Sequence, residues 1–209
     1  MDFQLKNLFS VKSKVVIITG SNRGNGFALA KGLSELGAVI IRIDLQFENE
    51  INTNDIIFDV SKTDHINDLV LEINNKYGKI DGLINNAGVS INTKNPYQDS
   101  LNYHKTLSIN LHSAFSFCSS VAVLMSKRKK GSIINITSLG AERGFPANPS
   151  YQISKAGLRQ LTKAMARDWG GHNLRFNNIC PGYIKTKMTE KSFADQKKNE
   201  ERLNQMLLK

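Results

Sequence analysis

Short apolar runs alternate with longer helical patterns along this chain, and the alternation restricts the fold more than any other feature. Six runs are compact and apolar enough to be buried strands: 15–18, 38–44, 56–58, 82–85, 132–136 and 175–179. Helical spacing separates them, as in Ile66, Leu69, Val70, Ile73 and Tyr77. Strands that alternate with helices form a parallel sheet wrapped on both faces, with right-handed crossovers. The sequence therefore predicts an α/β fold with a doubly wound parallel sheet.

Residues suited to binding or catalysis lie at the end of the predicted strands or directly after them. They are Gly20, Asp44, Asp59, Asn86, Ser138 and Pro181. Open parallel sheets bind their ligands at the edge formed by the carboxyl ends of the strands. We therefore expect these six positions to meet at one site.

The size and composition are those of one globular domain spanning 1–209. The chain has 209 residues, of which 40% are hydrophobic and 22% are charged, with no internal repeat or linker. No N-terminal segment has the apolar length of a signal peptide, and no apolar run approaches the ~20 residues of a bilayer span. Cys118 and Cys180 lie in apolar stretches, which suggests buried, reduced thiols. We expect a soluble cytoplasmic protein with no membrane partner.

The formal net charge of +10 raises the question of a nucleic-acid partner. Four positive charges lie in 127–130, at the end of a helical pattern and before Gly131, where cations complement a helix C-terminus. No interleaving of aromatic and basic residues indicates a base-stacking surface. A solvated helix end is the favoured interpretation, and an anionic partner or substrate is the alternative. The four histidines are scattered, so no metal site is expected.

The glycine-rich segment Gly20-x3-Gly24-x-Gly26 lies between a buried strand and a helical pattern. Glycine permits a tight turn and close approach of the backbone to phosphate, and the helix N-terminus offers unpaired N–H groups. In this setting the motif predicts a dinucleotide site. A purely structural turn is the alternative.

Asp44, 18 residues beyond Gly26, closes the second predicted strand. A carboxylate there can accept hydrogen bonds from the ribose hydroxyls and would repel a 2′-phosphate, which favours NAD(H) over NADP(H). Arg23 argues the other way, because a guanidinium can pair with that phosphate. Asp44 could also be a strand-end turn acid. The predicted cofactor is NAD, with NADP as the weaker choice.

Tyr151 and Lys155 are four residues apart in a helical pattern, so their side chains share one face. A nearby ammonium is expected to lower the phenol pKa from its usual value of ~10. The phenol can then give a proton to a carbonyl oxygen as hydride arrives, or accept one from an alcohol. Ser138 could hold the same substrate oxygen. Tyr183 and Lys187 repeat the spacing but follow a Pro-Gly pair, so we interpret them as a loop coincidence.

With these motifs in this order, the chain resembles the single-domain short-chain dehydrogenases/reductases from about Lys14 to Met188. Asp59-Val60, Asn85-Asn86-Ala87-Gly88, Asn110 and Pro181-Gly182 with Thr186 also match. The resemblance implies a Rossmann-type fold and a homo-oligomer, either dimer or tetramer. It implies that Asp59 and Val60 contact adenine, that Asn86, Ala87 and Gly88 line the adenosine side, and that Ile184 and Thr186 touch the carboxamide.

The resemblance also implies that Lys155 binds the nicotinamide ribose and that Asn110 holds a water linking Lys155 to solvent. The expected catalytic residues are Asn110, Ser138, Tyr151 and Lys155. The expected cofactor contacts are Gly20, Asn22, Arg23, Gly24, Asn25, Gly26, Asp44, Asp59, Val60, Asn86, Ala87, Gly88, Tyr151, Lys155, Pro181, Gly182, Ile184 and Thr186. Structural alternatives stay open: the asparagines could satisfy backbone groups, Asn110 could be a helix-interior polar residue, and Pro181-Gly182 could be a turn alone.

Two features depart from the family pattern. Asn25 stands where the family usually has an apolar residue. The chain stops soon after the sixth predicted strand, where relatives continue through a helix and a seventh strand. On this comparison the domain is expected to be C-terminally incomplete, with the sixth strand as an exposed edge.

The sequence thus favours an NAD(H)-dependent oxidoreductase that interconverts a secondary alcohol and a ketone. The segment 3–14 and Asp168-Trp169-Gly170 resemble members acting on sugar acids or 3-oxoacyl thioesters. A catalytically silent dinucleotide-binding protein, or a truncated remnant of such an enzyme, is the main alternative. A nucleic-acid-binding protein of the same fold is a third, and an epimerase is disfavoured because the chain leaves no room for a second substrate domain.

Overall fold

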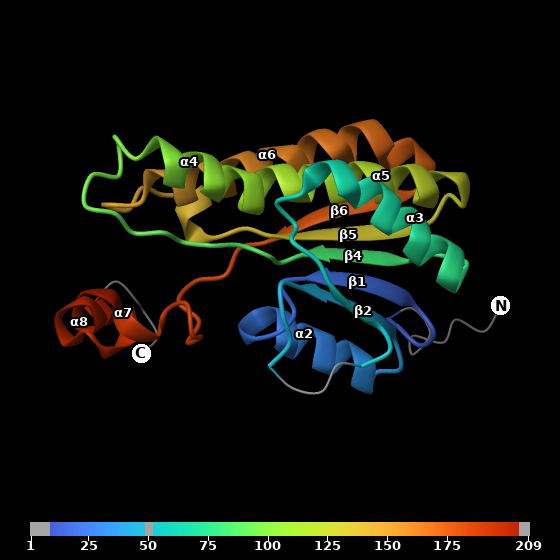
Figure 1. The fold of residues 1–209 in the computed structure, drawn as a ribbon, viewed down its shortest axis with the longest axis horizontal. Helices are drawn as coiled ribbons and strands as arrows, with labels where there is room; N and C mark the ends of the chain where they lie inside the picture. Colours follow the sequence, from blue (N-terminus) through green and yellow to red (C-terminus); the bar gives the residue numbers. More distant parts are fainter. Residues whose placement is uncertain (1–8, 49–51, 205–209) are drawn as a thin grey trace.

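A computed structural model of the chain describes residues 9–48 and 52–204. It contains one twisted parallel sheet between layers of helices (Figure 1). The strands are β1 (Val15–Thr19), β2 (Val39–Asp44), β3 (Asp55–Ile57), β4 (Gly82–Asn85), β5 (Gly131–Ile136) and β6 (Leu174–Ile179). Their order across the sheet is β3-β2-β1-β4-β5-β6, and neighbouring strands are parallel. The predicted doubly wound sheet is confirmed, and each predicted strand boundary lies within one residue of the observed one.

Helices cover both faces of this sheet. They are α2 (Gly24–Glu35), α3 (Ile66–Tyr77), α4 (Ser100–Leu107), α5 (Ser113–Lys127), α6 (Pro149–Trp169), α7 (Glu190–Ala194) and α8 (Gln196–Asn204), with the short turns η1 (Thr63–His65), η2 (Ser108–His112), η3 (Leu139–Ala141) and η4 (Gly170–His172). In Figure 1, α3, α5 and α6 lie on one face of the sheet and α2 lies on the other. The helical run from Ser100 to Lys127 is divided into α4 and α5 by η2, a π-helical turn. The polar segment after Met188 forms α7 and α8.

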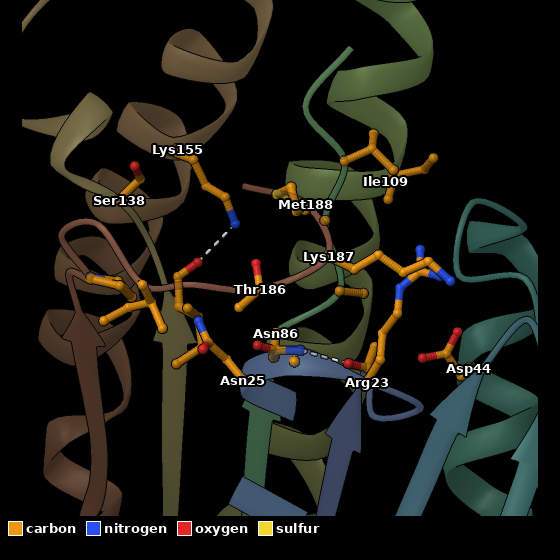
Figure 2. A pocket seen from close by; sticks show the side chains of 18 of the residues that line it. Arg23, Asn25, Asp44, Asn86, Ile109, Ser138, Lys155, Thr186, Lys187 and Met188 are labelled. Carbon is orange, nitrogen blue, oxygen red and sulfur yellow. Dashed lines mark hydrogen bonds between the residues drawn. The ribbon is translucent and has the colours of Figure 1, made fainter. Parts of the chain in front are cut away.

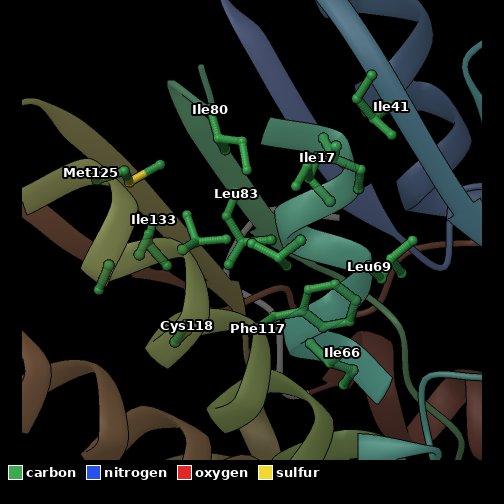
Figure 3. Close-up of a cluster of buried hydrophobic side chains, with 14 of the residues drawn as sticks. Ile17, Ile41, Ile66, Leu69, Ile80, Leu83, Phe117, Cys118, Met125 and Ile133 are labelled. Carbon is green, nitrogen blue, oxygen red and sulfur yellow. The ribbon is translucent and has the colours of Figure 1, made fainter. Parts of the chain in front are cut away.

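The main core lies between the sheet and the α3–α5 layer (Figure 3). Ile17, Leu83 and Ile133 from the strands meet Ile66 and Phe117 from the helices, and all five side chains are completely buried. Burying each such side chain contributes on the order of 1.5–3 kcal/mol. This packing fixes the strand ends, and with them the positions of the residues that follow each strand.

The two cysteines differ from the sequence-based expectation. Cys118 of α5 is completely buried, and burial raises its pKa to about 12. Cys180, which follows β6, is exposed, so the expectation of a buried thiol is wrong there. The apolar side chains before Cys180 indicated burial, but the residue lies just beyond the strand. Both thiols are free.

Among the described residues, one helical run, Ser100–Lys127, is long and apolar enough to cross a bilayer on length and composition. The sequence-based expectation that no run approaches this length is therefore wrong. Phe117, Cys118 and Val121 in this run are completely buried in the main core, as in the central helix of a globular domain. The length and composition of one such helix are weak support for a membrane span.

Candidate active site

A cleft runs along the carboxyl edge of the sheet, and the six strand-end positions singled out from the sequence all line it (Figure 2). The expected site residues that line it are Gly20, Arg23, Gly24, Asn25, Asp44, Asp59, Val60, Asn86, Ala87, Gly88, Ser138, Tyr151, Lys155, Pro181, Gly182, Ile184 and Thr186. Asn22, Gly26 and Asn110 do not line it. The glycine-rich turn and the Tyr151–Lys155 pair therefore open onto one space.

The glycine-rich turn is shaped by backbone geometry that side chains would disrupt. Gly20 and Gly24 have φ values of +65° and +57°, which glycine adopts without strain. A Cβ on Gly26 would lie 2.1 Å from the Gly20 carbonyl oxygen. Gly26 thus acts through packing beneath the turn and does not face the cleft.

The N-terminus of α2 lies at the position where the sequence predicted an anion site. Arg23 is the N-cap residue, its side chain makes no capping hydrogen bond, and no acidic residue lies in the first turn. The first N–H groups of the helix therefore keep their capacity to bind an anion. Together with the absence of side chains at Gly20 and Gly24, this end of the cleft fits a dinucleotide pyrophosphate.

Asn86 holds this turn against β1. Its Nδ2 donates to the carbonyl oxygens of Thr19, at 3.1 Å, and Gly20, at 2.7 Å. The Thr19 hydroxyl in turn accepts from the backbone N–H groups of Asn86 and Ala87, both at 3.1 Å. The alternative that the asparagines satisfy backbone groups therefore describes Asn86, because its amide fixes the shape of the glycine turn.

Asp44 is fixed at the end of β2 by two backbone donors. Its Oδ2 accepts from Asn22 N and its Oδ1 from Leu45 N, both at 2.8 Å. An ionised carboxylate has about four acceptor sites, so these bonds leave capacity for ribose hydroxyls. Asn22 does not line the cleft, because its backbone is used to brace Asp44.

Asp59 follows β3 and is held in a local turn. Its Oδ1 accepts from the N–H of Ser61, at 2.9 Å, and from the Ser61 hydroxyl, at 2.7 Å. The Ser61 side-chain hydrogen bond lowers the pKa of Asp59, although burial acts in the opposite direction. The carboxylate is therefore held ionised at the rim where the sequence placed an adenine contact.

Tyr151 and Lys155 lie on α6, where Lys155 is buried and Tyr151 is half-buried, and Ser138 reaches Tyr151 from beyond the end of β5. Burial raises the pKa of the Tyr151 phenol, and Cys180 nearby acts in the same direction, while a hydrogen bond with Ser138 acts to lower it. The expectation that a neighbouring ammonium lowers this pKa is wrong for the structure, because removal from water has the larger effect.

Burial also shifts the pKa of Lys155. Only 4% of the residue is exposed, and desolvation lowers its pKa to about 8. Its Nζ donates to the Ile136 carbonyl oxygen at 2.8 Å and lies 5.9 Å from the centroid of the Tyr151 ring (Figure 2). The ammonium is thus held near the Tyr151 ring and away from bulk water.

Asn110 lies in the π-helical turn η2, a local geometry that is frequent at functional sites. Its Nδ2 donates to Val89 O at 2.9 Å and to Ser154 Oγ at 3.0 Å, and its Oδ1 accepts from Val89 N at 2.8 Å. A Cβ on Gly88 would lie 3.3 Å from Asn110 Oδ1 and 3.4 Å from Lys155 Nζ. Gly88 therefore keeps open the space between the amide and the ammonium.

The cleft is also lined by residues that the sequence analysis did not predict as site residues: Leu45, Phe58, Val89, Ile109, Ile136, Thr137, Lys187, Met188 and Thr189. Leu45, Val89 and Thr137 directly flank predicted residues, so their position in sequence was an available signal. The second Tyr-x3-Lys pair divides in the structure: Lys187 lines the cleft, whereas Tyr183 does not and stacks under the Arg202 guanidinium at 4.7 Å.

Comparison with known proteins gives consistent matches. The family model for short chain dehydrogenase matches residues 14–197. Gluconate 5-dehydrogenase from Gluconobacter oxydans is 35% identical over 201 residues, which cover 91% of this chain and 78% of that protein. A 3-oxoacyl-[acyl-carrier-protein] reductase from Chlamydia muridarum is 34% identical over 200 residues, covering 90% and 80%.

Solved structures agree with these matches. The crystal structure of a gluconate 5-dehydrogenase from Burkholderia cenocepacia in complex with NADP and tartrate superposes with a TM-score of 0.84. It is 29% identical in sequence, and the match covers 92% of this chain and 80% of that one. The six-stranded sheet and its helices are therefore shared with a dinucleotide-binding relative.

Proposed function

We propose, from the premise that this chain belongs to the short-chain dehydrogenase family, that it interconverts a secondary alcohol and a ketone by hydride transfer with NAD(H). Its relatives include oxidoreductases acting on alcohol or ketone substrates. One observation carries the proposal: the glycine-rich turn and the Ser138–Tyr151–Lys155 group line a single cleft. A redox dinucleotide and a proton donor in one cleft are what this chemistry needs.

When bound, the nicotinamide dinucleotide supplies or accepts the hydride. The chain's own residues supply the proton and the positioning. Because burial raises its pKa, the Tyr151 phenol keeps its proton at neutral pH and can give it to the carbonyl oxygen of a ketone. Ser138 would hold that oxygen by a hydrogen bond, since it already reaches the phenol. In the opposite direction, the Tyr151 phenol would first have to lose its own proton, because only the phenolate can accept the proton of the alcohol.

Lys155 would act on Tyr151 and on the cofactor ribose. At neutral pH its ammonium carries a charge, since its pKa is about 8, and would stabilise negative charge on the phenol oxygen during proton transfer, although burial dominates the resting pKa of Tyr151. Asn110 and the space beside Gly88 would complete a proton path from Lys155 to solvent, as the family resemblance implies. These roles are part of the proposal.

The choice of NAD(H) over NADP(H) rests on Asp44. Its carboxylate is fixed at the end of β2 with free acceptor capacity, and it carries the charge that a 2′-phosphate would meet. The relative with bound NADP shows that the family accommodates the phosphate, so the preference is a property to be measured on this chain. The fit of the cleft to a dinucleotide does not depend on this choice.

For the substrate, we propose a sugar acid of the gluconate class, with a 3-oxoacyl thioester as the competing class. Gluconate-type substrates are named in relatives from Gluconobacter oxydans and Escherichia coli, the latter a 5-keto-D-gluconate 5-reductase at 34% identity. The 3-oxoacyl class is named in the relative from Chlamydia muridarum.

We further propose a cytoplasmic homo-oligomer. Free thiols at Cys118 and Cys180 fit a reducing compartment. Phe115 and Val123, two turns apart on α5, remain 55% and 47% exposed, and Ile153 on α6 remains 48% exposed. Apolar side chains on two neighbouring helices suit contact with a second copy, and light scattering of the purified protein tests this.

The function is tested by following reduced nicotinamide absorbance with NAD(H) and NADP(H) across sugar acids, polyols and 3-oxoacyl thioesters. The proposal expects turnover with at least one ketone or secondary alcohol. Dinucleotide binding measured by calorimetry, with no turnover on any of these compounds, would instead support a catalytically silent binding protein. Absence of dinucleotide binding would overturn the proposal.

A further inference from the structure

We propose that Glu48 is a specificity-determining residue, which favours NAD(H) by neutralising the two exposed cations of the cleft, Arg23 and Lys187. The inference rests on the proposed dinucleotide function and deepens it. Asp44 alone does not describe the charge at this end of the cleft. The charge that a 2′-phosphate meets depends also on what Arg23 and Lys187 are paired with.

Both cations contact the same carboxylate oxygen. Glu48 Oε1 lies 3.7 Å from Arg23 Nη1 and 3.6 Å from Lys187 Nζ. Within the part of the chain that the structure describes, the cleft is lined by three cationic side chains, and the third, Lys155, is buried beside Tyr151. The cations accessible to a ligand phosphate are therefore both paired with Glu48.

The pairing joins two sides of the cleft. Arg23 caps α2, while Lys187 belongs to the segment that follows β6. In Figure 2 the ends of these two side chains converge on the side of the cleft where Asp44 lies. Glu48 follows β2 and meets them there, although 139 residues separate it from Lys187 in the sequence.

The backbone of Glu48 is fixed to the glycine-rich turn. Its N–H donates to Asn22 Oδ1 at 3.0 Å, and Asn22 N donates to Asp44 Oδ2 at 2.8 Å. Asn22 is 9% exposed and does not line the cleft, so it acts as a positioning residue for both carboxylates. The two acids are thereby held at defined places on one rim.

The formal charges of the two cations and the two acids described above balance one another. Arg23 and Lys187 carry two positive charges, and Asp44 and Glu48 carry two negative charges. The Arg23, Glu48 and Lys187 side chains are 57%, 49% and 64% exposed, so each ion pair is weak and is screened by salt. An incoming phosphate can compete for such cations, and the net charge of the rim then decides how strongly it is attracted. Removing the Glu48 charge leaves this group of four side chains with a net positive charge.

The test is calorimetric titration of the full chain and its Glu48→Gln variant with NAD⁺ and NADP⁺ at low and high salt. We expect NADP⁺ to bind about fivefold more tightly to the variant, NAD⁺ to change by less than about twofold, and the gain to shrink at high salt. Adding Arg23→Gln or Lys187→Gln to Glu48→Gln should remove the gain. Glu35→Gln is the matched control, because Glu35 pairs with Lys31 at 4.0 Å on α2 and does not line the cleft.

The outcomes separate this inference from the function on which it rests. An unchanged ratio of NADP⁺ to NAD⁺ affinity in Glu48→Gln, with both dinucleotides still bound, would overturn the role of Glu48 alone. An equal gain for both dinucleotides would also overturn it, because Glu48 would then not discriminate between them. Binding of neither dinucleotide by the unaltered chain would overturn both proposals.

Discussion

The two ends of the cleft are constructed differently. At the glycine-rich end, Asp44 and Asn86 are held by hydrogen bonds to backbone groups, and the cations nearby are exposed. At the other end, Lys155 is buried and Tyr151 is half-buried, and removal from water shifts both pKa values toward the neutral forms. The first end depends on backbone shape and screened charge, whereas the second depends on titratable groups removed from water. Substitutions at the two ends should therefore differ in size, in pH dependence and in salt dependence.

The largest effect is expected from Tyr151→Phe at the buried end. Loss of the transferable proton should reduce turnover by about 10²–10⁴-fold, while NADH affinity stays within about threefold. Steady-state kinetics and a binding titration check the two parts separately. Tyr183→Phe is the matched control, because Tyr183 also precedes a lysine by four residues but does not line the cleft. Turnover of Tyr151→Phe at the unaltered rate would remove Tyr151 from the proton-transfer step.

The burial of Lys155 predicts a pH-dependent stability. Its pKa is about 8 in the folded chain and 10.5 as the ordinary value, so between these values the unfolded chain binds more protons. Stability from this group therefore rises with pH across that window, by up to about 3 kcal/mol, and is constant below it. The free energy of unfolding is measured with urea for the unaltered chain and for Lys155→Met at each pH. The difference between the two free energies should show this rise.

Lys163→Met provides the control for loss of a lysine, since Lys163 is exposed on the same helix. A difference between the unaltered chain and Lys155→Met that stays flat from neutral to alkaline pH would contradict the desolvation of Lys155. A difference that falls with pH would mean that an anionic partner, and not burial, dominates its environment.

Gly26→Ala tests whether the glycine-rich turn depends on close packing of its backbone. The new Cβ would lie 2.1 Å from Gly20 O and 2.5 Å from Asn86 Nδ2, so the turn must shift. Overpacking of this kind costs about 1–3 kcal/mol, and dinucleotide binding should weaken with it. In contrast, Gly32→Ala in the same helix meets nothing within 4 Å and should stabilise the chain by about 0.5–1 kcal/mol. Equal unfolding free energies for the two variants would show that the turn accommodates a side chain.

The fold and the strand-end residues could be predicted because each has a local signal. Apolar runs mark the strands, and parallel strands bring Gly20, Asp44 and Ser138 to one edge wherever the intervening helices lie. The π-helical turn that carries Asn110 was not predictable, because five residues of altered hydrogen bonding leave no period in the sequence. The raised pKa of Tyr151 was missed for another reason: residue spacing shows a neighbouring charge but not the loss of water.

Contacts between loops that are distant in the sequence also could not be predicted from it. Glu48 and Lys187 lie in irregular segments after β2 and β6, and no sequence pattern links the two residues. Lys187 carried a misleading signal, because its spacing from Tyr183 imitates the Tyr151–Lys155 pair. Only the arrangement of the loops shows that the lysine faces the cleft while the tyrosine does not.

A smaller effect than that of Tyr151→Phe is expected from removing the Asp44 charge at the exposed end. Asp44→Ala should shift the ratio of NADP(H) to NAD(H) affinity by about tenfold, because the carboxylate no longer repels a 2′-phosphate. It also deletes the acceptor of Asn22 N, so Asp44→Asn, which keeps an acceptor oxygen, separates charge from architecture. Asp68→Ala, an exposed acid on α3, is the control.

If both Asp44 variants shift the ratio, and the shift shrinks with added salt, the glycine-rich end selects its cofactor by screened charge. A shift in Asp44→Ala alone would assign the preference to the position of the Asn22 loop instead. An unchanged ratio in both would count against the ribose role of Asp44. The Tyr151→Phe defect, arising where water is excluded, should not respond to salt in the same way, and this contrast distinguishes the two ends of the cleft.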